Sequence, residues 1–324
     1  MDQSPPSHSV SRRPTAPFAA QIAVLVPCHN EAATVGSVIR EFRQYLPAAR
    51  IYVYDNASTD NTAEIAREAG AEVRHERLRG KGNVVRRMLA DVDADIYILV
   101  DGDDTYDAAS APRLVEHLLT NGLDMVCGSR VALAEAAFRP GHAFGNKLLT
   151  GIVSRVFGSQ VKDMLSGYRA MSRRFVKSFP ALSAGFEIET ELTVHALELR
   201  VPMSDLPTPY RERPAGSASK LHTFRDGVRI LRLIFHLVKE ERPLLFFSSV
   251  CLALVLTSIG MGVPVISTYL HTGLVPRLPT AILATGLMIL AFLTLVCGLI
   301  LDTVTRGRRE LKRLAYLWAG ASPH

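Results

Sequence analysis

Short apolar runs alternate with amphipathic stretches along residues 21–130 of the chain. Nearly every position within a run is apolar, which is the pattern of strands buried on both faces of a parallel sheet. The stretches between them repeat apolar residues at helical spacing. We expect strands at 22–26, 51–54, 96–100 and 125–127, and helices at 33–45, 61–69, 83–91 and 111–120. This alternation predicts an α/β domain with a doubly wound, mostly parallel sheet.

Two later stretches, 243–270 and 278–301, contain no Asp, Glu, Lys or Arg. Each exceeds the ~20 apolar residues that cross the hydrocarbon core of a bilayer. A pair of buried core helices is the alternative, but such helices rarely run so long without a charge. Because residues 271–277 are too few for a domain, we expect a transmembrane hairpin over 243–302, with spans at about 243–268 and 279–301.

Positive charge lies on the side of the hairpin that both termini share. The hairpin loop holds only Arg277, whereas basic residues flank the outer ends of both spans. These are Arg225, Arg229, Arg232, Lys239 and Arg242 before the first span, and Arg306, Arg308, Arg309, Lys312 and Arg313 after the second. The asymmetry predicts an integral membrane protein with its large domain and both termini in the cytoplasm. We expect the membrane to be a bacterial inner membrane. Residues 303–324 are then a basic cytoplasmic tail.

Residues 222–242 combine apolar positions at helical spacing with basic residues alongside them. This is the pattern of an amphipathic helix at the membrane interface, although a helix packed on the large domain would look similar. The first 20 residues are rich in Ser and Pro and lack the apolar core of a signal peptide, so we expect a disordered tail. The α/β domain therefore covers 21–221.

Composition adds two limits to this picture. The net charge of +6 comes mainly from the segments beside the spans, which favours anionic lipid headgroups as partners over nucleic acid. The four cysteines, Cys28, Cys127, Cys251 and Cys297, are scattered. Their spacing indicates neither a disulfide framework nor a zinc site, and it fits a reducing compartment.

Polar residues follow three of the expected strands, at 27–31, 55–60 and 101–104. Ligands of such sheets bind beyond the carboxyl ends of the strands, so we expect these residues to line one site. Asp101, Asp103 and Asp104 repel one another unless a cation intervenes, and hard cations such as Mg²⁺ prefer carboxylate and phosphate oxygens. Gly102 permits the turn that this requires. An acidic surface turn is the alternative.

Lys81 lies between Gly80 and Gly82 in a turn before an expected helix, where phosphate groups commonly bind. A solvated surface charge is the alternative for this lysine, as for each basic residue considered below.

The motifs VPCHNE (26–31), DNASTD (55–60), RGKG (79–82) and VDGDD (100–104) occur in this order along the chain. Together they resemble the successive signatures of family 2 glycosyltransferases with the GT-A fold. DMLSGYR (163–169), GFEIE (185–189) and SKL (219–221) resemble the branch of that family that contains dolichol-phosphate mannose synthase and the bacterial polyprenyl-phosphate glycosyltransferases. The resemblance covers roughly residues 21–240.

The resemblance implies a role for each matching residue. Asp101 and Asp103 would hold a metal, Mg²⁺ or Mn²⁺, on the donor diphosphate. Thr105 stands where some relatives carry a further glutamine ligand, which Asp104 or a water would replace. The residues expected to bind the donor nucleotide are Pro27, His29, Glu31, Asp55, Lys81, Asp101 and Gly102, and those expected to bind phosphate or the acceptor are Arg130, Lys220 and, on weaker grounds, Arg139 and Arg211.

Asp163 is placed by the resemblance near the reacting centre, as the catalytic residue. A phosphate monoester has a second pKa near ~6, so a phosphate acceptor needs alignment more than deprotonation. We therefore expect Asp163 to orient the acceptor or a basic partner. Glu187 and Glu189 would face differently on a helix, so at most one of them points into the site.

The expected function is metal-dependent, inverting transfer of a hexose from a UDP- or GDP-sugar to a polyprenyl phosphate, undecaprenyl or dolichyl. The alternatives are a family 2 transferase with another lipid or glycolipid acceptor, a non-catalytic membrane partner with a degenerate domain, and a nucleotidyltransferase. The sequence leaves the sugar, the nucleotide and a homo-oligomeric state open.

Overall fold

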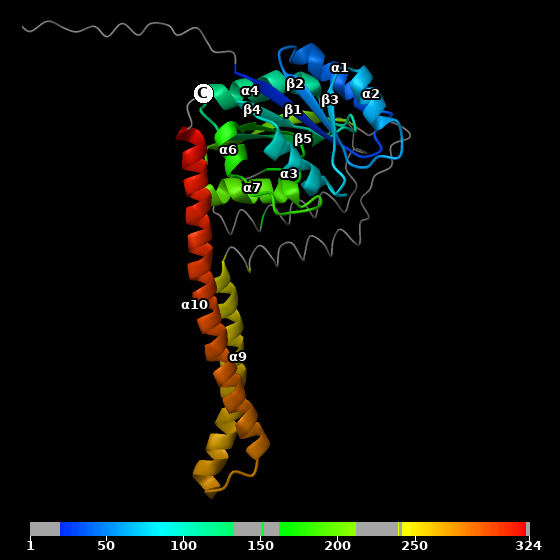
Figure 1. Ribbon diagram of the computed structural model, residues 1–324. Coiled ribbons are helices and arrows are strands. Elements are labelled where there is room, and N and C mark those ends of the chain that lie inside the picture. The colour runs from blue at the N-terminus through cyan, green and yellow to red at the C-terminus, as the bar shows by residue number, and fades with distance from the viewer. Residues whose placement is uncertain (1–19, 133–150, 152–161, 212–238, 240–241, 322–324) are drawn as a thin grey trace, which may run out of the picture.

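The computed structural model describes residues 20–132, 151, 162–211, 239 and 242–321. Nearly all of the expected tail at 1–20 and of the expected interfacial helix at 222–242 lies outside these ranges, as do Arg139 and Lys220. The described residues form an α/β domain and a long pair of helices that extends away from it (Figure 1).

The domain is built on a seven-stranded sheet with the order β3-β2-β1-β4-β6-β5-β7. β6 runs antiparallel to β4 and β5, and the remaining pairs are parallel. The mostly parallel α/β sheet and the expected strands are confirmed. The strands are β1 (Ile22–Cys28), β2 (Arg50–Asp55), β3 (Glu72–His75), β4 (Ile96–Leu99), β5 (Met125–Ala132), β6 (Arg169–Ser172) and β7 (Met203–Tyr210).

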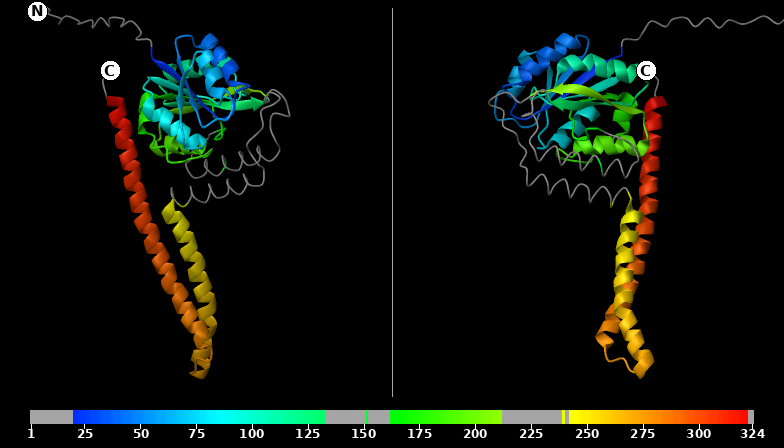
Figure 2. Two further views of the ribbon diagram at one scale, coloured as in Figure 1. Left: turned by 45° about the vertical axis from the view of Figure 1, so that its right-hand side comes forward. Right: turned by 180° about the vertical axis from the view of Figure 1, so that it is seen from behind.

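Helices cover both faces of the sheet (Figures 1 and 2). Alternate residues of β1 enter different cores, because Val24 and Val26 pack with α1 whereas Leu25 packs with α3. The helices on the first face are α1 (Val35–Tyr45), α2 (Thr62–Glu68) and α4 (Ala111–Thr120), and those on the second are α3 (Lys81–Asp91), α6 (Arg173–Ser178) and α7 (Ile188–Leu199).

Two long helices complete the described chain, α9 (Pro243–Thr272) and α10 (Leu278–Ala321). They lie side by side over much of their length (Figure 2), and Ser258 Oγ donates a hydrogen bond of 2.7 Å to the Ala284 carbonyl between them. By length and composition, both are able to cross a membrane.

α10 continues without a break to Ala321, so most of the segment expected as a basic tail belongs to this helix. The charges that begin at Asp302 mark where an apolar span ends. They do not mark where the helix ends, because Arg, Lys, Glu, Leu and Ala all favour helix. The outer part of α10 lies against α6 and α7 of the α/β domain (Figure 1).

The buried His195 of α7 should make the free energy of unfolding depend on pH. It is 1% exposed between Phe175 and Phe179, and burial, followed by Lys312, lowers its pKa from 6.5 to about 4. The unfolded chain therefore gains this proton near pH 6.5, and the folded chain gains it only near pH 4. Lowering the pH from 7.5 to 5 should cost the folded state about 2 kcal/mol through this residue.

Thermal unfolding of the full chain in detergent checks this expectation. His195→Gln, which can keep a hydrogen bond to Ser178, should reduce the drop in Tm between pH 7.5 and 5 by about 4–8 °C. An equal drop in both proteins would show that His195 is protonated in the folded state.

Candidate functional site

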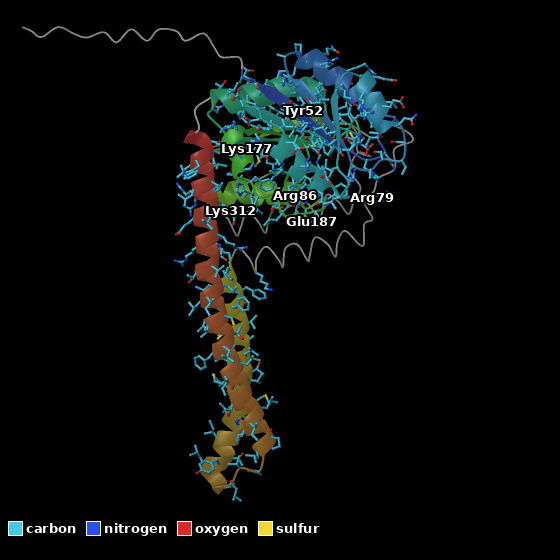
Figure 3. The ribbon with its side chains drawn as sticks, viewed as in Figure 1. Tyr52, Arg79, Arg86, Lys177, Glu187 and Lys312 are labelled. Atoms are coloured by element: carbon cyan, nitrogen blue, oxygen red, sulfur yellow. The ribbon has the colours of Figure 1, made fainter. Side chains whose placement is uncertain are left out.

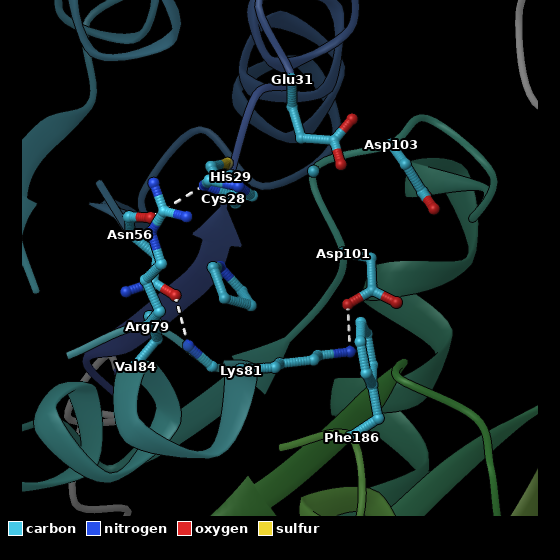
Figure 4. Close-up of a pocket in the computed structure, with 13 residues that line it drawn as sticks. Cys28, His29, Glu31, Asn56, Arg79, Lys81, Val84, Asp101, Asp103 and Phe186 are labelled. Atoms are coloured by element: carbon cyan, nitrogen blue, oxygen red, sulfur yellow. Dashed lines mark hydrogen bonds and ion pairs between the residues drawn. The ribbon is translucent and has the colours of Figure 1, made fainter. Parts of the chain in front are cut away.

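A pocket of about 190 Å³ opens beyond the carboxyl ends of β1 and β4 (Figure 4). It brings together expected site residues from separate motifs, namely Pro27, His29, Glu31, Lys81, Asp101, Gly102 and Asp103. The pocket is also lined by Cys28, Asn56, Arg79, Gly80, Val84 and Phe186. The sheet edge chosen from the strand-end residues is therefore where the pocket lies.

Lys81 crosses the floor of this pocket between two carboxylates. It begins α3, and its ammonium group pairs with Asp101 and with Glu189 of α7. The side chain is only 10% exposed. Burial lowers the pKa of Lys81, but the two carboxylates outweigh this and the net effect is a raised pKa. Lys81 therefore stays charged, and it links α3, the turn after β4 and α7.

Glu189 takes the inward position of the two acids in GFEIE. One carboxylate oxygen binds Lys81, and the other is buried without a hydrogen-bond partner among the described residues. Burial raises the pKa of Glu189, against the opposing effect of Lys81. Glu187 lies at the N-cap of α7 and does not line the pocket. Sequence reasoning limited the site to at most one of these acids without choosing between them.

The acidic turn after β4 is held in one shape. Thr105 Oγ1 donates a hydrogen bond of 2.6 Å to Asp103 Oδ1, so Thr105 orients this carboxylate. At Gly102 a Cβ would lie 2.6 Å from the Cys28 sulfur, so any larger residue would force the Cys28 side chain to move. Asp104 adopts a left-handed φ of 59° and is not among the pocket-lining residues. Asp101 and Asp103 are thus the acids of this turn that line the pocket.

Asp55 lies at the end of β2 and is nearly buried, but it does not line the pocket. One of its carboxylate oxygens has no hydrogen-bond partner among the described residues. The next residue, Asn56, lines the pocket instead. Its side chain donates to the carbonyls of Glu76 and Leu78 and accepts from the Gly80 N–H at 2.8 Å. Asn56 therefore shapes the loop that carries Arg79 and Lys81.

Arg130 and Asp163 form a bidentate ion pair. Arg130 Nε lies 2.7 Å from Asp163 Oδ2, and Arg130 Nη2 lies 2.8 Å from Oδ1. The guanidinium also lies 5.5 Å from the centre of the Tyr210 ring. Both carboxylate oxygens of Asp163 thus bind the guanidinium group of Arg130.

The turn that carries Asp163 reaches the pocket through Gly167. A Cβ on Gly167 would lie 2.7 Å from Asp101 Oδ2, so the turn abuts this carboxylate directly. Ser166 Oγ donates a 2.6 Å hydrogen bond to the Gly128 carbonyl, and the Gly167 N–H donates to the Tyr106 hydroxyl at 2.8 Å. The ion pair and the acidic turn therefore belong to one connected site.

Arg211 is not aimed at this pocket. Its guanidinium pairs with Asp107 at 3.1 Å and with Glu41 at 3.6 Å, and its backbone N–H donates to the Thr105 carbonyl. Arg79 and Phe186 do line the pocket, although sequence reasoning gave neither of them a role. Both stand inside motifs quoted above, so their position in RGKG and GFEIE was the available signal.

The donor atoms of the pocket fit a hard cation shared with a phosphate ligand. Glu31, Asp101 and Asp103 are the carboxylates that line the pocket (Figure 4). Within the described ranges, no group of three His, Cys, Asp or Glu side chains is arranged to hold a metal by itself. Mg²⁺-type ions are usually bound by one or two carboxylates together with substrate phosphates. The residues present suit an ion of that kind.

The family model described as Glycosyl transferase family 2 matches residues 23–179. The glycosyltransferase AglJ of Haloferax volcanii is 32% identical over 303 residues, which cover 91% of this chain and 98% of that protein. A dolichyl-phosphate hexose transferase of the same organism is 28% identical, over 68% of this chain and 95% of that protein.

A solved structure shares the fold. It is glucosyl-3-phosphoglycerate synthase of Mycobacterium tuberculosis in complex with Mn²⁺, UDP and glucosyl-3-phosphoglycerate. The TM-score is 0.55 at 25% identity, over 68% of this chain and 79% of that one.

The ion pair of Arg130 and Asp163 should contribute to the free energy of unfolding in a way that variants can measure. Asp163→Leu removes the carboxylate that binds the largely buried guanidinium of Arg130 at two points, which should cost about 3–5 kcal/mol. The double variant Arg130→Met, Asp163→Leu removes both charges and should recover most of that loss. Thermal unfolding of the three proteins in detergent measures the difference, and an Asp163→Leu chain as stable as the unaltered one would contradict the prediction.

Proposed function

Because the chain belongs to Glycosyl transferase family 2, we propose that it transfers a hexose from a UDP- or GDP-sugar to a polyprenyl phosphate, with a divalent metal and inversion of configuration. The chain is a glycosyltransferase; the donor, acceptor, metal and membrane face are the proposed part. The observation that carries the proposal is the pocket lined by Asp101, Asp103 and Lys81, in which Lys81 pairs with Asp101.

A donor diphosphate bound with a metal ion needs carboxylates that hold the metal and basic groups that bind the phosphates. Asp101 and Asp103 would hold Mg²⁺ or Mn²⁺, and such an ion, when bound, stabilises the negative charge of a leaving diphosphate. Lys81 and Arg79 add positive charge within the same pocket. Because Lys81 also pairs with Glu189, its buried charge keeps a partner if Asp101 turns to a cation. The neighbour crystallised with Mn²⁺ and UDP supports this assignment.

The nucleotide would lie toward the end of β1. Pro27, His29, Glu31 and Gly102 line that side of the pocket, and Asp55 lies at the end of the adjacent strand β2. His29 Nδ1 is 2.8 Å from the Asn56 carbonyl, which fixes the ring.

The acceptor phosphate would meet Arg130. Guanidinium groups suit phosphate because they offer paired donors in a fixed plane, and Asp163 holds this one by two hydrogen bonds. Asp163 therefore acts as a positioning group for Arg130. Arg139 and Lys220 remain proposed further phosphate contacts, whereas the acidic partners of Arg211 favour a structural role for it.

A polyprenyl acceptor is supported by two features. The relative named dolichyl-phosphate hexose transferase matches over 68% of this chain, and α9 and α10 are able to cross a membrane. We propose that the domain works at the cytoplasmic face, with the basic segment 222–242 as an interfacial helix.

The test is an assay of the full chain in detergent with undecaprenyl phosphate, a panel of nucleotide sugars and Mg²⁺ or Mn²⁺. We expect release of a nucleoside diphosphate with at least one donor and formation of an acid-labile lipid-linked hexose, both abolished by EDTA. Asp103→Asn should lower kcat by about 100-fold, because it weakens the hold on the metal ion whose positive charge stabilises the transition state.

The matched control for that variant is Asp104→Asn, which removes a neighbouring carboxylate that does not line the pocket and should keep most activity. Release of pyrophosphate would instead indicate a nucleotidyltransferase. Transfer to a diacylglycerol or glycolipid, but not to undecaprenyl phosphate, would refute the proposed acceptor.

Asp163 gives a separate prediction about pH. If Asp163 positions Arg130, Asp163→Asn should lower kcat by a similar factor at every pH between 6 and 9, since the loss is geometric. The pH profile of kcat for the two proteins, measured below the Tm of the variant, checks this. Full recovery of the variant at high pH would restore a general-base role for Asp163.

A further inference from the structure

α10 is longer than a membrane crossing needs. Its 44 residues extend about 66 Å at a helical rise of about 1.5 Å per residue. A bilayer core is about 30 Å thick, so roughly half of the helix lies beyond it. That outer half runs along the α/β domain (Figures 1 and 2), although a hairpin needs no such extension in order to span.

The first contact of the outer half is with Glu198 at the end of α7. Lys312 Nζ lies 2.6 Å from Glu198 Oε2, and Arg309 Nε lies 3.8 Å from Oε1. The Glu198 side chain is only 3% exposed. Figure 3 shows Lys312 on α10 beside the α/β domain. A nearly buried carboxylate of the domain thus depends on α10 for these basic partners.

The second contact is with Asp124, which precedes β5 and is fully buried. The Tyr316 hydroxyl donates a hydrogen bond of 2.7 Å to Asp124 Oδ2, and Arg174 of α6 binds the same carboxylate. The Arg174 guanidinium also lies 5.1 Å from the centre of the Tyr316 ring. At Gly320, a Cβ would lie 3.5 Å from the Arg174 side chain.

These contacts form one stripe of the helix. Arg309, Lys312, Tyr316 and Gly320 are spaced by three or four residues, so they share a face. Docking therefore fixes both the rotation of α10 about its axis and its position along that axis. Buried, hydrogen-bonded ion pairs give little net stability but penalise any other arrangement.

We propose that the outer half of α10 is a docking strut that holds the α/β domain at a fixed height and orientation relative to the membrane hairpin. Glu198 and Asp124 are the two anchor points on the domain, and Lys312 and Tyr316 are the matching residues on the helix. This inference rests on the proposed function in one respect, namely that the acceptor phosphate is presented at headgroup depth. The strut then acts as a positioning device for an acceptor that cannot leave the membrane.

Loss of the docking of α10 should affect two kinds of acceptor differently. A long-chain polyprenyl phosphate in a bilayer is held at one depth, so the site must be brought to it. A short-chain polyprenyl phosphate that dissolves in water diffuses to the site wherever the domain lies. Loss of docking should therefore reduce transfer to the first acceptor and spare transfer to the second.

The experiment uses charge reversal in the full chain, reconstituted in nanodiscs of phosphatidylethanolamine and phosphatidylglycerol. Lys312→Glu should lower kcat/KM for undecaprenyl phosphate by about tenfold or more, because small misplacements of reacting groups are costly. Transfer to a water-soluble short-chain acceptor should change less than about twofold, because that acceptor diffuses to the site and is not misplaced when the domain moves. Adding Glu198→Lys should restore the long-chain activity.

The matched control is Arg306→Ala, which removes a positive charge from the same helix. Arg306 pairs with Asp302 of α10 itself, and its side chain is 73% exposed. It should leave both activities unchanged. An equal loss with both acceptors in Lys312→Glu would mean that α10 only stabilises the domain, and it would overturn the proposal.

A distance measurement tests the strut without any activity. Spin labels at Glu116 on α4 and Leu245 on α9, in a chain with Cys251 and Cys297 replaced by Ala, report the position of the domain relative to the hairpin. The unaltered chain and the charge-swapped double variant should give one narrow distance distribution, and Lys312→Glu a broad one. A narrow, unshifted distribution in Lys312→Glu would overturn the proposal even if the acceptor were a different lipid.

Discussion

The ion pairs of Lys81 with Asp101 and Glu189 are the interaction on which the arrangement of the site depends. Three separate parts of the chain meet at this one ammonium group. None of the three charges is well solvated, so each is stable there only because the others are present. The cluster fixes where α3 begins relative to β4, and therefore where the pocket opens.

The same principle operates at two further points of this sheet edge. Thr105 holds Asp103 through a short hydrogen bond, and Arg130 holds Asp163 through two. Each of these carboxylates is thus oriented by contacts within the protein itself. On the proposed function, the acids of one pocket wall would face a metal while Lys81, Arg79 and Arg130 face phosphates. Preorganised charges of this kind need little rearrangement during reaction, which is how electrostatic catalysis gains its effect.

Sequence patterns predicted the parts of the fold that depend on continuous apolar runs. The central strands around Val24 and Ile98 are buried on both faces, so their position was evident. β3, β6 and β7 were not predicted, because β3 is half exposed, β6 buries an arginine and β7 contains Pro207 and Pro209. Arg169 of β6 is tolerated there because it donates to the carbonyls of Met164 and Glu189. Such long-range compensation leaves no local pattern.

The residues of the site likewise fall into those that the sequence pattern predicted and those that it did not. Residues at strand ends, such as Asp101 and Glu31, were predictable because a parallel sheet gathers its carboxyl ends at one edge. Glu189 and Asn56 act through partners far away in sequence, so spacing alone did not select them. The docking of α10 was hidden for a related reason, since the residues that flank a span carry the same charges whether they face solvent or a neighbouring domain.

On the proposed function, Asp101 and Asp103 bind a divalent ion together with a nucleoside diphosphate, and Asp101 also pairs with Lys81. The most direct test is to titrate the full chain with Mn²⁺ and follow the free ion by electron paramagnetic resonance, with and without UDP or GDP. One of these nucleotides should tighten Mn²⁺ binding by at least about tenfold, because its phosphates complete the ligand set. Asp103→Asn should abolish this effect. Mn²⁺ binding that is equally tight without nucleotide, or unchanged in Asp103→Asn, would refute a metal site shared by these carboxylates and the nucleotide.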